Sequence, residues 1–410
     1  MDNSQLIIEK VEQYRQEIIE IQRALVATPA LGPDNGGQGE AAKAALVQGW
    51  LEAMGLAVQR VDAPDPRAAG GARPNVAATY PGGPGRRVWV LSHLDVVPPG
   101  DAALWSSDPW RLRVDGDKLY GRGVNDNHAG LVSSLIGLKA LIDLGIKPAG
   151  DVGLILVSDE ETSSKHGLAH VLEARPDLFG PDDLIIVPDS GLEDGSGIEV
   201  VEKSMLWLRV EVSGRQVHAS MPHKGVNALH AAARMICAVG EIAERYPQTD
   251  PRFDPPGSTM QATRKDAGVQ NINTVPGRDV FYLDCRMLPG ISLGEVIAEI
   301  RRVFEAIAAE DGATVDVEIV QKLQAPPATP DEAPVVLALR RAVKRVLGLE
   351  ARPYGIGGGT VAAFFRQKGL PAAVWQTAVD TAHMPDEWIS LDGLIKDAAV
   401  FALVYAGFEG

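Results

Sequence analysis

Five short segments of the chain carry histidine and carboxylate side chains at the ends of predicted strands or at the start of a predicted helix. The segments are SHLDVVP (92–98), GRGVNDNHAG (121–130), SDEET (158–162), VPDS (187–190) and TAHMPDE (381–387). Such side chains bind divalent metal ions and move protons in hydrolytic reactions. In the first segment His93 and Asp95 face the same side of an extended chain, so Asp95 could accept the ring N–H that a metal-bound His93 leaves free.

Taken singly, the segments also have structural interpretations. His93 and Asp95 could form a buried pair, and Asp126 could cap the helix that follows it. The adjacent Glu160 and Glu161 are harder to explain in this way, because carboxylates beside a buried strand are costly unless a positive group pairs with them.

Together, the segments supply more carboxylates than a single zinc ion needs. The candidate groups are His93, Asp126, Glu160, Glu161, Asp189 and His383. Two ions bridged by one carboxylate fit this set better, and paired ions of this kind serve hydrolysis. The chain has only two cysteines, Cys237 and Cys285, so neither a cysteine-built zinc site nor a disulfide scaffold is expected.

The elements that position these residues alternate between strands and helices. Continuous apolar runs at 152–158 and 184–188 have the length of strands that are buried on both faces. A helix is predicted over 128–144, where leucines recur on one face and Gly145 ends the pattern. This order predicts an α/β domain with a mostly parallel sheet, whose carboxyl edge is the usual place for a ligand.

The pattern changes after about residue 203. Residues 206–214 alternate between apolar and polar, and they are followed by a helix at 227–245, strands at 271–275 and 279–287, a helix at 293–310 and a strand at 314–320. This β-α-β-β-α-β order is the ferredoxin-like arrangement. We therefore expect a catalytic domain in two parts, 1–203 and 323–410, with an inserted α+β lid domain at 204–322.

The composition limits the partners and the location. The 410 residues include 39 Lys and Arg and 54 Asp and Glu, a net charge of −15, which argues against nucleic acid as a partner. The first 25 residues have the spacing of an amphipathic helix rather than of a targeting signal, and no apolar stretch is long enough for a membrane span. These features predict a cytoplasmic protein.

These segments and their order resemble the M20 metallopeptidases over essentially the whole chain. The resemblance implies a zinc-peptidase-like catalytic domain, a metal site of His93, Asp126 and Asp189, and a second one of Asp126, Glu161 and His383. It implies that Glu160 is the general base and that Asp95 belongs to the His-x-Asp motif of the catalytic site. Two divalent ions per chain are expected, zinc first, with cobalt or manganese as alternatives.

The resemblance extends to substrate binding. It implies that His218 of the lid contacts the substrate or the tetrahedral intermediate, and that Asn273 and Arg286 contact a substrate carboxylate. The loop GIGGGT (355–360) matches the substrate loop and contributes Gly358, Gly359 and Thr360. Members of the family often form homodimers through the lid.

The chain departs from the family pattern at two places. The family usually continues Met-Lys-Gly-Gly after the bridging aspartate, whereas this chain has Asn127, His128, Ala129 and Gly130. His128 is expected at the surface or as a cap. Val361 stands where the family often has Asp or Ser after Gly-Gly-Thr, which weakens the transfer of substrate specificity.

The expected activity is hydrolysis of an amide bond in a small peptide or an N-acyl amino acid. Asp189, where deacylases of the family commonly have Glu, favours a peptide. The length of the chain and its simple lid favour the alternative, a deacylase such as a succinyl-diaminopimelate desuccinylase or an acetylornithine deacetylase. A catalytically inactive ligand-binding relative is the remote alternative.

Overall fold

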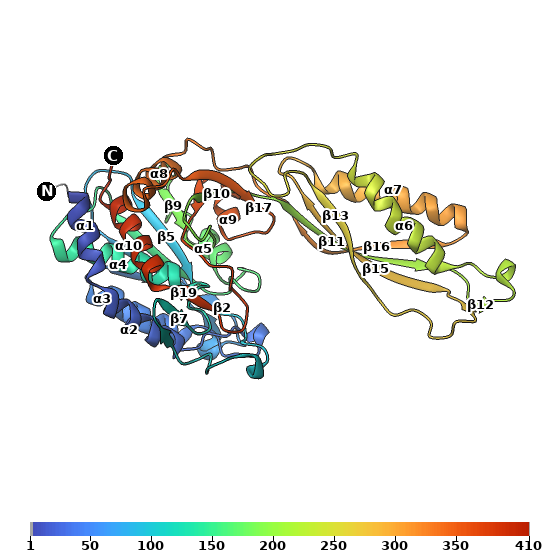
Figure 1. Cartoon of the computed structure of the whole chain (residues 1–410), viewed down its shortest axis with the longest axis horizontal. Helices are drawn as coiled ribbons and strands as arrows, with labels where there is room; N and C mark the ends of the chain where they lie inside the picture. Colours follow the sequence, from blue (N-terminus) through green and yellow to red (C-terminus); the bar gives the residue numbers. More distant parts are fainter. Residues whose placement is uncertain (1–2, 410) are drawn as a thin grey trace. The chain divides into compact units, whose positions relative to one another are not determined.

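The computed structural model describes residues 3–409, which form two compact units (Figure 1). The first unit contains the residues up to Val200, Thr329–Pro353 and the residues from Thr360 on, and the second contains Val201–Ala328 and Tyr354–Gly359. The second unit thus includes Tyr354–Gly359, which the sequence-based division places in 323–410. Residues 1, 2 and 410 lie outside the described residues. The sequence-based division includes all three, and the predicted N-terminal helix includes residues 1 and 2.

An eight-stranded sheet forms the centre of the first unit. Its strands, in spatial order, are β1 (Ala57–Arg60), β4 (Val76–Tyr80), β8 (Val152–Val157), β5 (Val88–His93), β9 (Leu184–Val187), β18 (Ala372–Val374), β10 (Gly197–Glu202) and β17 (Arg352–Ile356). The four central strands, β8, β5, β9 and β18, pair in parallel. β1 and β4 pair antiparallel with their neighbours, and β10 pairs antiparallel with β18. Every residue of β5, β8 and β9 is buried, as expected for strands that are covered on both faces.

Helices cover this sheet. The helices of the unit are α1 (Asn3–Glu12), α2 (Arg15–Val26), α3 (Ala41–Ala53), α4 (His128–Leu144), α5 (Leu168–Ala174), α8 (Pro334–Leu347), α9 (Ala362–Gln367) and α10 (Leu391–Tyr405). α5 and α9 pack in one hydrophobic core with alternate residues of the central strands. α4 and α8 contact these strands and also contact α10 (Figure 1). The amphipathic segment predicted over the first 25 residues is two helices, because the chain turns at residues 13 and 14.

Short elements complete the first unit. They are the pair β2 (Ala63–Pro64) and β3 (Ala72–Arg73), the three-stranded sheet of β19 (Trp388–Ser390), β7 (Lys118–Tyr120) and β6 (Arg113–Asp115), and the 3₁₀ helices η1 (Pro33–Asn35), η2 (Ala69–Gly71) and η3 (Ala102–Leu104). The predicted α/β class is confirmed.

The second unit is a four-stranded antiparallel sheet with two helices on one face (Figure 1). In chain order its elements are β11 (Ser204–Ser213), β12 (Val217–His218), η4 (Pro222–Lys224), α6 (Ala228–Ala243), β13 (Thr259–Lys265), β14 (Thr274–Val275), β15 (Arg278–Met287), α7 (Leu293–Asp311) and β16 (Thr314–Leu323). The strand order β13-β15-β11-β16 is that of the predicted ferredoxin-like fold. α6 and α7 bury their apolar faces against the sheet.

One predicted strand of the second unit was wrong. The sheet uses β13 at Thr259–Lys265 in the position that was assigned to 271–275, and Thr274–Val275 instead pairs with β12 in a separate two-stranded ribbon. β13 is an edge strand with mostly exposed side chains, so its sequence TMQATRK lacks the apolar alternation that marks a half-buried strand.

No helix among residues 3–409 combines the length and the apolar character that crossing a membrane requires.

Candidate metal centre

The first unit brings together side chains that follow its central parallel strands. His93 is the last residue of β5, Glu161 follows β8, and Asp189 follows β9. Asp126 lies in the turn that leads into α4, and His383 lies between β18 and β19. Because parallel strands present their carboxyl ends at one edge of a sheet, side chains far apart in sequence meet there.

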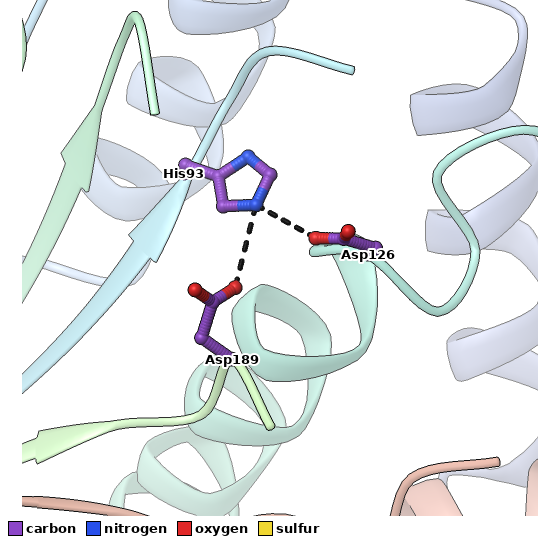
Figure 2. Close-up of side chains that lie close together, drawn as sticks. All are labelled: His93, Asp126 and Asp189. Atoms are coloured by element: carbon purple, nitrogen blue, oxygen red, sulfur yellow. Dashed lines mark hydrogen bonds and ion pairs between the residues drawn. The ribbon is translucent and has the colours of Figure 1, made fainter. Parts of the chain in front are cut away.

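Two groups of three side chains have the geometry of metal sites. In the first, His93 Nε2 lies 2.8 Å from Asp126 Oδ1 and 3.4 Å from Asp189 Oδ1, as Figure 2 shows. In the second, His383 Nε2 lies 2.9 Å from Glu161 Oε2 and 3.1 Å from Asp126 Oδ2. Within each group the ligand atoms all lie within 4.8 Å of one another. Asp126 belongs to both groups and offers a different oxygen to each.

The electrostatics of this cluster fit bound cations. Burial raises the pKa of Glu161 to about 7, and its Oε1 is buried without a hydrogen-bond partner among the described residues. Hydrogen bonds to Asp126 and Glu161 raise the pKa of His383 to about 10. Burial alone would lower the pKa of His93, but its bonds to Asp126 and Asp189 raise that pKa well above its usual value. Nitrogen and carboxylate donors that compete for protons in this way suit zinc or a similar divalent ion.

Glu160 adjoins the cluster without belonging to either ligand group. Burial and the nearby charge of Asp189 raise the pKa of Glu160 well above its usual value. A carboxylate with a raised pKa is suited to exchanging a proton near neutral pH.

Asp95 supports the cluster through main-chain bonds. Its two carboxylate oxygens accept the backbone N–H groups of Glu160 and Glu161, each at 3.1 Å. The second ring nitrogen of His93, Nδ1, lies 2.9 Å from the backbone oxygen of Asp95 and 3.6 Å from its carboxylate. The main chain of Asp95 is therefore the nearer acceptor for His93, and its side chain fixes the two glutamates.

A second buried carboxylate, Glu387, holds the turn that carries Asp126. Glu387 accepts the backbone N–H groups of Gly123, Asn125 and Asp126 at 2.9–3.0 Å and pairs with Arg122 at 2.7 Å. Glu387 ends the segment 381–387, one of the five that carry histidine and carboxylate side chains, but it belongs to neither group of three. Its partner Arg122 was missed, because nothing in the sequence links two residues that lie 265 positions apart.

A third buried network holds the segment before Glu160. Arg73 is fully buried; it pairs with Glu40 and lies 3.4 Å from Asp159. Asp159 has a φ of +63°, and its carboxylate accepts the backbone N–H of His166 at 2.9 Å. These contacts fix the main chain next to the two glutamates.

The expectation for His128 was wrong. His128 is fully buried rather than exposed, and its Nε2 lies 2.7 Å from Nζ of Lys43, which is also buried. Helix α4 packs between the sheet and other helices, so its first turn has no solvent side. Burial lowers the pKa of Lys43 to about 7 and that of His128 well below its usual value.

Two of the predicted substrate contacts, His218 and Asn273, lie side by side in the second unit. His218 pairs with Thr274 in the β12–β14 ribbon, and the Asn273 carbonyl accepts the N–H of Ala219 at 2.8 Å. His218 Nδ1 accepts the backbone N–H of Ser220 at 3.2 Å. In the neutral ring the proton is therefore on Nε2, which can donate it to a ligand.

Arg286 is already engaged within the second unit. It donates to both oxygens of Asp284, at 2.7 and 3.0 Å, and to the carbonyl of Gly357 at 2.9 Å. These bonds leave one N–H on each terminal nitrogen of the guanidinium. Gly357 belongs to the same loop as Gly358 and Gly359, while Thr360 begins the next part of the first unit, where its Oγ1 accepts the N–H of Ala362 at 3.2 Å.

Comparisons with known proteins agree with this arrangement. The sequence pattern of peptidase family M20/M25/M40 matches residues 89–406. The chain is 36% identical over 405 residues to an uncharacterized metallohydrolase of Methanococcus maripaludis, a match that covers 94% of this chain and 97% of the relative. It is 28% identical to the succinyl-diaminopimelate desuccinylase of Gluconacetobacter diazotrophicus, with 93% of this chain and 94% of that protein covered.

The fold has also been seen in solved structures. A tripeptidase from Staphylococcus aureus superposes with a TM-score of 0.75 at 20% identity, covering 96% of this chain and 98% of that one.

Proposed function

Because the chain belongs to peptidase family M20/M25/M40 and is a metal-dependent amide hydrolase, we propose that it cleaves a small peptide or N-acyl amino acid that carries a free carboxylate. We propose further that two divalent ions, zinc by preference, are held by His93, Asp126 and Asp189 and by Asp126, Glu161 and His383. The observation that carries this proposal is the position of Asp126 between the two ligand groups. Two ions bridged in this way would polarise the amide carbonyl and lower the pKa of water.

The residues of the chain supply the proton transfers. Glu160 accepts a proton from the attacking water and passes it to the leaving nitrogen. The burial and negative surroundings that raise the pKa of Glu160 support this role, and bound cations would lower that pKa again. We assign to Nε2–H of His218 the stabilisation of the oxyanion, because Nδ1 is occupied by Ser220.

The substrate assignment rests on two observations. Asp189 favours a peptide, since the acylase branch of the family commonly has glutamate at this position. The desuccinylase relative at 28% identity favours an N-acyl amino acid. Both substrates carry a carboxylate, for which Arg286 offers two unused N–H groups beside the Gly358–Thr360 segment. Asn273 precedes β14, next to the start of β15, whereas Arg286 lies near the end of that strand, so within one chain the two would contact different parts of a ligand.

A substrate panel crossed with a Glu160 variant tests the proposal. Protein loaded with zinc, cobalt or manganese is assayed on dipeptides and on N-acetyl and N-succinyl amino acids. Glu160→Ala and Glu160→Gln should keep the bound metal and lose turnover by several orders of magnitude. The matched control is Glu173→Gln, which changes an exposed glutamate of α5. Full activity in Glu160→Ala would contradict the assignment of the base, and fewer than about one ion per chain after loading would favour an inactive binding protein.

The proposal includes a cytoplasmic homodimer that associates through the second unit. The near absence of cysteine supports a reducing compartment. The edge strands β13 and β16 offer free backbone groups for association between copies. Analytical ultracentrifugation, repeated on protein that lacks residues 201–328, measures whether the second unit carries the contact.

A further inference from the structure

Asn127 touches one of the candidate metal ligands directly. Its side chain is 1% exposed, and its Nδ2 lies 2.8 Å from Asp189 Oδ1 and 2.5 Å from the backbone oxygen of Pro188. Asn127 immediately follows Asp126, so the turn that supplies the shared ligand also supplies a contact to a ligand of the first group.

The orientation of the Asn127 amide is fixed by its neighbours. Both contacts are to oxygen atoms that only accept hydrogen bonds, so the NH₂ group must face them. The Oδ1 atom is left buried without a partner among the described residues, which carries a free-energy cost. An apolar side chain would avoid this cost but would give up both N–H bonds, one of them to a charged acceptor.

We propose that Asn127 is a positioning residue that holds Oδ1 of Asp189 toward His93 and thereby strengthens metal binding by the His93–Asp126–Asp189 group. This inference rests on the proposed metal-ligand role of Asp189. The Asn127 bond to Oδ1, the oxygen that lies 3.4 Å from His93 Nε2, restrains rotation of the Asp189 carboxylate.

The test compares two buried amides in the same region. Asn127→Leu removes the donors while keeping a similar volume. Gln22→Leu is the matched control, because Gln22 is also fully buried. Among the described residues its Oε1 has no hydrogen-bond partner, and its Nε2 donates to the carbonyl of Val124 in the same turn. Asn127→Met is a second variant in case the branched leucine does not fit, and circular dichroism confirms that each protein is folded.

Metal-free protein is titrated with Co²⁺, and binding is followed by calorimetry and by the visible absorption spectrum. We expect Asn127→Leu to weaken one binding step by about 10–100-fold and to alter the spectrum of that step, and to leave the other step unchanged. Gln22→Leu should match the wild type in both steps.

Several results would overturn the proposal. They are equal weakening of both steps, the same change in Gln22→Leu, or unchanged binding in the folded Asn127 variants. If the wild type binds one ion only, the two-ion part of the proposed function fails. In that case the role of Asn127 is still decided by whether Asn127→Leu weakens that single step.

Discussion

The carboxylate of Glu387 accepts the backbone N–H of Asp126 at 3.0 Å, so a side chain four residues after one candidate ligand holds the main chain of another. The same carboxylate pairs with Arg122, and both side chains are buried. Hydrogen bonds within the protein thus hold Asp126 close to the segment of His383 without a metal ion.

Replacing Glu387 should destabilise the fold strongly. Glu387→Gln leaves the charge of Arg122 buried without its partner. It also replaces one carboxylate oxygen, which accepts backbone N–H groups, by an NH₂ group that cannot accept them. Breaking a buried pair of this kind costs about 3–5 kcal/mol. Urea denaturation of the metal-free protein measures the loss in the free energy of unfolding. The control is Asp380→Asn, which changes an exposed carboxylate of the same segment. The double variant Glu387→Gln/Arg122→Met should lose less than the sum of the single variants; strict additivity would mean that the two groups do not interact.

Asp397 should make stability depend on pH in a range where most side chains do not titrate. Burial raises the pKa of Asp397 from 3.8 to about 8. Between these values the folded protein holds a proton that the unfolded chain has lost, so stability falls as the pH rises, by about 1.4 kcal/mol per unit for one proton. Asp397→Asn, which still accepts the N–H of Thr377, should gain stability relative to wild type from pH 5.5 to 7.5. A constant difference between the two proteins over this range would show that Asp397 is ionised throughout.

Metal binding should release protons at neutral pH. The pKa of His383, raised to about 10, means that its ring holds a proton at neutral pH in the metal-free protein, and the contacts of His93 with Asp126 and Asp189 raise the pKa of that ring as well, whereas only the neutral ring binds a metal. Metal affinity should therefore rise with pH. Calorimetry in buffers of different ionisation enthalpy counts the protons. His383→Gln should release about one fewer proton than wild type at pH 7, and the surface variant His230→Gln should release the same number.

Asp95→Asn should impair turnover more than metal content. The asparagine side chain can accept only one of the two backbone N–H groups of Glu160 and Glu161, so the base would shift. A displacement of about 1 Å in a catalytic group can cost about 100-fold in rate. Turnover on the best substrate of the panel and metal content by atomic absorption are measured together. If turnover and metal content fell in proportion, Asp95 would act by supporting the metal ligands rather than by positioning Glu160.

Sequence patterns predicted His93, Glu161 and Asp189 because they end or follow buried strands, and Asp126 because it lies in a glycine-containing turn before a helix. The helix α4 was also predicted to the residue, since Gly145 adopts the left-handed conformation that ends it. β13 was missed because an edge strand whose side chains are mostly exposed needs no alternation of apolar and polar residues. The burial of His128, its contact with Lys43 and the pairing of Arg122 with Glu387 were missed because they depend on packing between distant segments.

If two ions bind as proposed, the shared Asp126 would make the two ligand groups thermodynamically dependent on each other. An ion in one group would withdraw charge from the carboxylate that serves the other, and by linkage each ion would change the affinity of its neighbour by the same factor. Because Glu387 holds the turn of Asp126, the main chain has little freedom to move and relieve this coupling. Removal of one ion by a chelator would therefore change the affinity for the other. When metal is scarce, the occupancies of the two groups would change together.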